Sequence, residues 1–288
     1  MDTLHTMRTT RAPRARRQQR ALRVSIAFVA LLAVVAIAAP WLAPYSPIDQ
    51  LDLDLLKSRP PSLAHPFGTD MYSRDVLSRV IYGARVSLSV ATAAVALALA
   101  VGTSFGAVAA LAGGTVDRLL MRFLDVLLAI PRLLVLLAIA AFWGPLPLPV
   151  LIMVLGFTGW YDVARLVRGE TQSVLARDFI LAARAGGVGR GRLLLRHVLP
   201  HLVPVLVVSA TLGVAHTIAL EAGLSYLGLG VQPPTASWGT ILQDGLGAVD
   251  TQWWLTLFPG VATVIAVLAC NALGDALRDE FASAQVPA

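Results

Sequence analysis

Four ionisable residues lie within or beside long apolar runs of this chain of 288 residues: Asp125, Arg132, His216 and Glu221. If these runs cross a bilayer, each of the four is a candidate functional residue, because a charge inside a membrane is costly to keep there. Asp125 and Arg132 are seven positions apart, so we expect them to share one helix face as a mutually supporting pair. A lone histidine is a poor metal site, because metals need several ligands, and we expect no metal site. His216 and Glu221 are our candidates for a pathway or gate.

Motifs for catalysis are absent from the sequence. It contains no GxxxxGK[ST] phosphate-binding loop, so the chain itself is not expected to bind ATP in the usual way, and it contains no HExxH. The single cysteine, Cys270, allows no disulfide within the chain. These observations disfavour an intramembrane enzyme.

The segment 177–201 combines five arginines and four glycines between long apolar stretches. Residues 174–185 have apolar positions on a partly helical period, which predicts a short amphipathic helix and not a further membrane span. The glycines at 186–189 then break this helix, and RGRLLLRHV resumes as a second short helix before Pro200. Physical chemistry alone leaves two interpretations open: an interfacial helix with arginines on lipid head groups, or a docking helix for a soluble partner.

Composition places these residues in a membrane protein. The chain is 57% hydrophobic and 14% charged, with a mean hydropathy of +0.72. Apolar runs of about 20 residues predict transmembrane helices, and the fold expected is all-α. Within the second run, GTSFG at 102–106 has the small-xxx-small pattern that permits close helix contact. We expect six spans, at about 24–42, 86–112, 119–143, 146–164, 202–220 and 254–273.

Basic residues set the expected orientation. Seventeen of the 23 fall in segments that six spans would place on the side of the N-terminus, and five fall on the other side. The positive-inside rule then puts both termini and the loop 165–198 in the cytoplasm. This rule also accounts for the net charge of +6 without a nucleic-acid partner.

Three stretches together resemble ABC-importer permeases. AARAGG, nine further residues and HVLP resemble the family's EAA loop, with Leu181 in place of its glutamate and His197 in place of its isoleucine. Residues 65–88 are similar to the N-terminal signature of the second, "C"-type, permease of the dipeptide, oligopeptide and nickel importers. Ser73 stands there where glycine is usual, and His201 stands where asparagine usually follows Pro200. Residues 221–239 resemble the last outside segment of that family.

The resemblance implies a type I ABC importer permease with six spans in a bacterial inner or plasma membrane. Segment 177–201 would then hold a coupling helix seated on a cytoplasmic ATPase. Expected partners are a second permease subunit, two ATPase subunits, an extracytoplasmic binding protein and membrane lipid. No cofactor is expected in this chain, because ATP and Mg²⁺ would bind the ATPase subunits. The matching positions expected to act in coupling are Ala182, Ala183, Gly186, Gly187, Leu199 and Pro200.

The expected function is half of a translocation pathway for di- or oligopeptides. A nickel importer of the same family is the alternative, and a stand-alone carrier or channel is a further one that the docking loop disfavours. The expected organisation is a basic tail at 1–23, a first span and outside segment at 24–85, a core permease domain at 86–280 and a tail at 281–288.

Overall fold

The computed structural model describes residues 3–284, with the side chains of residues 19–283, and this part of the chain is helical without β-strands. The all-α prediction is confirmed. The elements are α1 (Thr3–Ile37), α2 (Ala39–Leu42), α3 (Val76–Ala112), α4 (Gly114–Leu128), α5 (Arg132–Trp143), α6 (Leu148–Leu175), α7 (Asp178–Ala185), α8 (Arg190–Leu193), the π-helical turn η1 (Leu194–Val198), α9 (Leu199–Tyr226), α10 (Trp238–Asp244) and α11 (Trp254–Ala284).

Five stretches are long and apolar enough to cross a membrane: part of α1, α3, α6, the continuous α8–η1–α9 and α11. The third predicted span, 119–143, is not one helix, because α4 and α5 are bent by 70°. The break lies at Pro131, whose ring disfavours helical angles in the preceding residue. Counted as one bent span, α4 and α5 complete the six crossings expected.

Several helices extend beyond the apolar runs that predicted them, among them α3, α6, α9 and α11. Helix α3 begins at Val76 and not near residue 86, because the Asp75 carboxylate caps it and accepts a hydrogen bond from the Ser78 N–H at 2.8 Å. Helix α6 continues to Leu175, eleven residues into the predicted loop 165–198. Hydropathy ends a predicted span at the first arginines, but a helix can continue where those arginines find carboxylates on a neighbouring helix.

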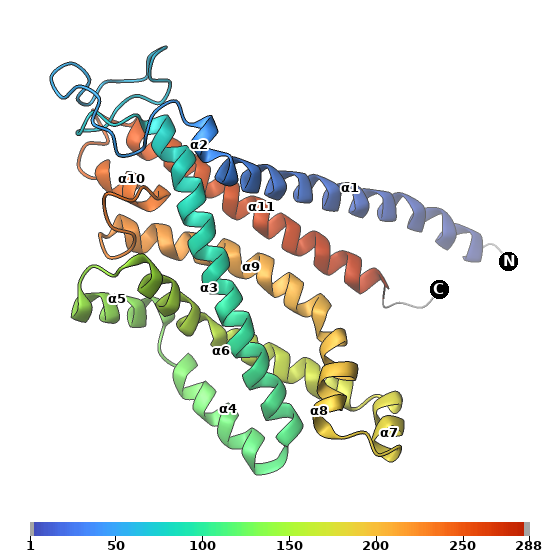
Figure 1. The fold of residues 1–288 in the computed structure, drawn as a ribbon. Helices are drawn as coiled ribbons and strands as arrows, with labels where there is room; N and C mark the ends of the chain where they lie inside the picture. Colours follow the sequence, from blue (N-terminus) through green and yellow to red (C-terminus); the bar gives the residue numbers. More distant parts are fainter. Residues whose placement is uncertain (1–2, 285–288) are drawn as a thin grey trace.

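The helices form two closely packed groups. Helix α6 runs along α3, and α9 runs along α11, while α6 and α9 contact each other much less (Figure 1). Gly102 and Gly106 lie where α3 meets α6, and a Cβ on Gly106 would come within 2.3 Å of the Ala164 carbonyl oxygen. The close contact predicted from GTSFG is therefore confirmed. Helix α1 lies outside this core, against α11 and α3.

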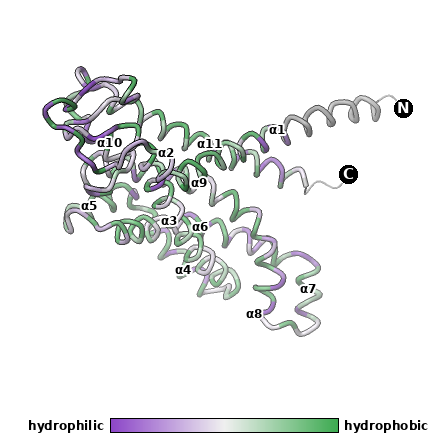
Figure 2. The backbone as a smooth tube through the Cα atoms, turned by 45° about the horizontal axis from the view of Figure 1, so that its top comes forward, coloured by the Kyte–Doolittle hydropathy of each residue, from purple (hydrophilic) through white to green (hydrophobic). Residues whose placement is uncertain are grey.

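The polar segments gather at two ends of the molecule. Residues 43–75 and α10 form one end, and α7 and α8 lie at the other (Figure 1). The hydropathy colouring follows this division, with hydrophilic backbone concentrated in the 43–75 loops and around α7 and α8 (Figure 2). The ends of α1 and α11 that carry the termini lie away from residues 43–75 (Figure 1).

Buried ion pairs join the 43–75 segment to α10. The Asp70 carboxylate accepts hydrogen bonds from Arg74 Nε and Arg79 Nη1, each at 2.6 Å. Arg79 Nη1 also donates to Asp244 Oδ2 at the end of α10, at 2.6 Å. The Asp70 side chain is fully buried, and its charge is balanced by two arginines. This end is therefore fixed by a network that spans 175 positions of sequence, from Asp70 to Asp244.

Candidate functional site

Helix α7 ends in a Schellman motif that requires glycine at one position. Gly187 has φ +78, which residues with a side chain rarely adopt. Its N–H donates to the Arg184 carbonyl at 3.0 Å, and the Val188 N–H donates to the Ala183 carbonyl at 3.1 Å. Gly186 has φ −76 and needs no such freedom. The predicted helix break is confirmed, and Gly187 is the residue that makes the turn.

One face of α7 anchors the loop to the membrane helices. Ile180 is fully buried in a cluster that includes Val174 from α6, Leu193 from α8 and Leu202 from α9. The apolar contacts fix the loop's position relative to α3, α6 and α9. A displacement of α7 would therefore be transmitted to these helices.

The opposite face of α7 is exposed and partly apolar. Leu181 is 53% exposed and Phe179 is 40% exposed, although the Phe179 ring also stacks on His201. Five arginines around the loop are exposed and form no ion pair among the side chains described: Arg177, Arg184, Arg190, Arg192 and Arg196. An apolar patch ringed by unpaired cations is suited to a partner surface with a groove and carboxylates.

The six predicted coupling residues divide between these two faces. Ala182, Gly186, Gly187 and Pro200 are exposed, whereas Ala183 and Leu199 pack against the buried cluster. Helix α8 continues through η1 into α9 as one stretch to Tyr226. The widened π-helical turn lies just before Pro200, which has no N–H to continue the α-helical hydrogen bonds.

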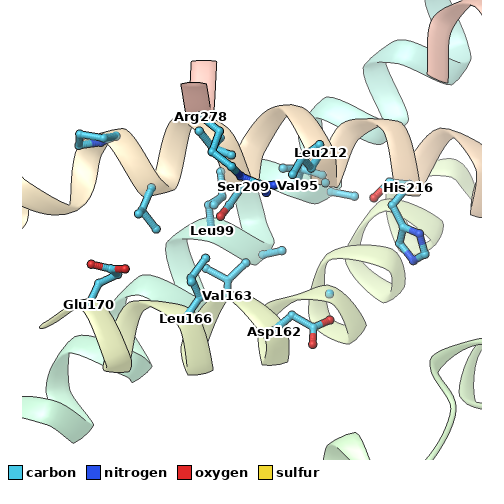
Figure 3. Close-up of a pocket in the computed structure, with 18 of the residues that line it drawn as sticks. Val95, Leu99, Asp162, Val163, Leu166, Glu170, Ser209, Leu212, His216 and Arg278 are labelled. Atoms are coloured by element: carbon cyan, nitrogen blue, oxygen red, sulfur yellow. The ribbon is translucent and has the colours of Figure 1, made fainter. Parts of the chain in front are cut away.

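A cavity of about 550 Å³ lies between α6 and α9, with α3 forming part of its lining (Figure 3). Apolar side chains such as Val163, Leu166 and Leu212 supply most of its walls. Its ionisable residues come from four helices: Arg132 from α5, Asp162 and Glu170 from α6, His216 from α9 and Arg278 from α11.

Asp162 is a residue of this cavity that the sequence analysis did not single out. It lies inside the predicted span 146–164, in GWYDVARL, so the rule for intramembrane charges would have found it. His216, which that analysis did select, lines the same cavity, and Figure 3 places the two side chains on the facing helices α6 and α9.

The predicted pairing of Asp125 with Arg132 is wrong. The bend at Pro131 puts them on different helices, so a spacing of seven no longer brings them to one face. Asp125 instead pairs with Arg165 of α6, and Arg132 donates to the Leu155 carbonyl at 2.7 Å and to the Thr158 hydroxyl at 3.2 Å. Both interactions attach the bent pair α4–α5 to α6.

A further ion pair attaches α4 to α6. Arg168 donates from Nε and Nη2 to the two carboxylate oxygens of Asp117, at 3.0 and 2.6 Å. This bidentate geometry is the strong form of an arginine–carboxylate contact. No local pattern predicts this contact, because the partners are 51 positions apart.

Glu221 is buried outside the cavity. Its carboxylate accepts hydrogen bonds from the Ser87 hydroxyl at 2.8 Å and the Ser225 hydroxyl at 2.7 Å. The Ser87 hydroxyl in turn accepts from the Trp238 N–H at 3.3 Å, so this cluster joins α3, α9 and α10. The structure therefore separates the two candidates: His216 lies on the cavity, and Glu221 lies at a junction of helices.

Comparison with known protein families matches most of the chain. Residues 102–284 match the family described as binding-protein-dependent transport system inner membrane component. The chain belongs to this family. Residues 12–61 match the N-terminal transmembrane domain of oligopeptide transport permease C. These matches confirm the resemblance to "C"-type importer permeases that the three sequence stretches indicated.

Relatives of this inner membrane component cover most of its length. A Brucella suis protein is 45% identical over 243 residues, which are 84% of this chain and 79% of the relative. A dipeptide transport system permease protein of Bacillus subtilis is 38% identical, over 83% of this chain and 74% of the relative. An oligopeptide transport system permease protein of Haemophilus influenzae is 35% identical, over 84% and 77%.

Proposed function

We propose that the chain is the membrane-spanning permease subunit of an ATP-driven importer for di- or oligopeptides, forming half of the translocation pathway. The observation that carries the proposal is the exposed apolar face of α7, whose opposite face packs through Ile180 against helices that line a cavity. The names of relatives at 35% to 38% identity favour peptides over nickel as the substrate.

The subunit would act with a second permease, two ATPase subunits and an extracytoplasmic binding protein. ATP and Mg²⁺ would bind the ATPase subunits, which would hydrolyse the ATP. This chain would not do so, because its sequence contains no phosphate-binding loop. Movement of an ATPase subunit would displace α7, and the buried cluster would pass that displacement to α6 and α9.

Two substitutions test the docking face. Leu181→Asp places a charge on the exposed face of α7, and Leu63→Asp makes the same change at an exposed leucine of the 43–75 segment. The ATPase subunits should co-purify with the Leu63 variant but not with the Leu181 variant. Equal recovery of the ATPase with both variants would refute docking at α7.

Uptake of a labelled peptide panel, with nickel in parallel, tests the substrate. Proteoliposomes holding the whole complex should accumulate peptides, depend on ATP and the binding protein, and move negligible nickel. ATP-dependent nickel uptake without peptide uptake would make the nickel importer the better account.

The orientation proposed is cytoplasmic for α7 and both termini, in a bacterial inner or plasma membrane. Gly189 lies in the exposed turn after α7, and the sole native cysteine can be removed. Gly189→Cys in a Cys270→Ala background should resist a membrane-impermeant thiol reagent in intact cells and react after lysis. Ready labelling of intact cells would reverse the orientation.

A further inference from the structure

Asp162 is an ionisable residue of the cavity that packing and ion pairing leave unexplained. It lies in the middle of α6, about 20 Å from either end of that helix. Its side chain is exposed, and among the side chains described it forms no ion pair or hydrogen bond. Because a carboxylate without a direct ion pair is costly within a spanning helix, its position points to a cationic ligand.

The neighbouring basic residues do not neutralise Asp162 by direct contact. Arg132 interacts electrostatically with Asp162, but its guanidinium donates to the Leu155 carbonyl and the Thr158 hydroxyl, two turns and one turn earlier on α6. His216 lies on the facing helix α9 and forms no ion pair with Asp162 within the described part of the chain (Figure 3). The carboxylate therefore remains accessible from the cavity.

The rest of the cavity suits a ligand with one charged end and a variable body. Its volume of about 550 Å³ is within the range of small-molecule sites. Its walls beside Asp162 are mainly apolar, from residues such as Val163 and Leu212. The other acidic residue of the cavity, Glu170, lies eight residues further along α6, about 12 Å towards its end.

We propose that Asp162 binds the α-ammonium group of the peptide while it passes through the cavity. This inference rests on the proposed function and adds a requirement for a free amino terminus. The ammonium group would donate charge-assisted hydrogen bonds to the carboxylate. The apolar walls would contact the side chains without selecting a sequence, and every peptide with a free amino terminus carries the same cation.

Equilibrium binding to the purified complex tests this role. The complex of both permeases and the ATPase subunits is placed in nanodiscs without the binding protein, whose own selectivity would otherwise dominate. The probes are radiolabelled tri-alanine and its N-acetylated form. The parent, Asp162→Asn and Glu170→Gln are compared, and Glu170→Gln is the matched control because it removes the other carboxylate of the same cavity.

The parent should bind tri-alanine about tenfold more tightly than the acetylated peptide, since a hydrogen bond to a charged group is lost on acetylation. Asp162→Asn should lower the affinity for tri-alanine about tenfold and leave the affinity for the acetylated peptide unchanged. This variant should therefore no longer discriminate between the two peptides, whereas Glu170→Gln should still bind tri-alanine more tightly than the acetylated form.

Discrimination that persists in Asp162→Asn, or that Glu170→Gln abolishes instead, would overturn the proposal. So would undetectable binding of tri-alanine to a parent complex that transports it. A separate uptake assay of the parent with its binding protein distinguishes failure of the proposed function from failure of the role given to Asp162. If that complex moves no peptide, the proposed function fails; if it moves peptide and Asp162→Asn binds both probes as the parent does, only the role of Asp162 fails.

Discussion

Replacing Gly187 by alanine should weaken coupling without weakening insertion into the membrane. A Cβ at Gly187 would meet no atom within 4 Å, so the substitution creates no clash. Its cost comes from the backbone, because φ is +78 and a residue with a Cβ loses about 1–2 kcal/mol in this region. Lower chain entropy in the unfolded state offsets about 0.4–1 kcal/mol of that cost.

The net cost, about 1 kcal/mol, falls on the turn that closes α7. Such a cost lowers the population of the native turn about fivefold relative to alternatives. We expect peptide uptake, and the stimulation of ATP hydrolysis by the loaded binding protein, to fall by up to about fivefold. Both are measured in proteoliposomes with equal amounts of assembled complex.

Two controls separate backbone geometry from other effects. Gly186→Ala adds the same methyl group one residue earlier, where φ is −76 and the nearest atoms would be at an ordinary 3.5 Å. It should retain coupling. Gly187→Asn should recover part of the loss, because asparagine adopts positive φ more readily than alanine. Equal activity of the three variants, or a greater loss in Gly186→Ala, would refute the reasoning.

Three further substitutions test the packing of the fold by thermal unfolding of the purified complex. Gly106→Ala should lower stability by about 1–3 kcal/mol, because its Cβ would clash with the backbone of α6. Gly169→Ala is the control and should not lower stability, because its Cβ would meet no atom within 4 Å. Equal unfolding midpoints of the two variants would contradict the close contact. Ser73→Gly should raise stability by about 1 kcal/mol, because Ser73 has φ 57 and its buried hydroxyl has no hydrogen-bond partner among the described residues. A lower unfolding midpoint would count against strain at this position. Asp117→Asn should cost about 2 kcal/mol by breaking its bidentate arginine contact, and an unchanged midpoint would show that this contact is dispensable.

The sequence predicted those features that depend on local pattern. Apolar runs located the spans, and the glycines after Ala185 located the end of α7, because each signal lies within one turn or one helix length. The unusual serine at position 73 also has a local explanation: it occupies a left-handed conformation, in which glycine is more favourable.

The sequence could not predict which distant partners meet. Asp125 and Arg132 failed as a pair because a bend at Pro131 changed the geometry that their spacing assumed. Tertiary packing pairs Arg79 with Asp244 and Arg168 with Asp117, and no local sequence pattern predicts these pairs. Hydropathy likewise ended α6 too early, since charges satisfied by a neighbouring helix do not stop a helix. Asp162 was visible in the sequence, but only the structure shows that it forms no ion pair among the described side chains.

The continuity of α8, η1 and α9 has a mechanical consequence when combined with the junction at Glu221. Measured along the helix from that junction, Arg190 is about 45 Å away, Ser209 about 18 Å and His216 only about 8 Å. The bend between α9 and α8 makes the direct distance to Arg190 shorter (Figure 1). A displacement of α8 about this junction would then move the backbone at Ser209 less than at α8, and the backbone at His216 least. The displacement of α9 would therefore be small near His216, which faces Asp162, and largest at the end of the stretch beside α7. Opening would therefore widen one mouth of the cavity first and keep its inner end nearly constant in width.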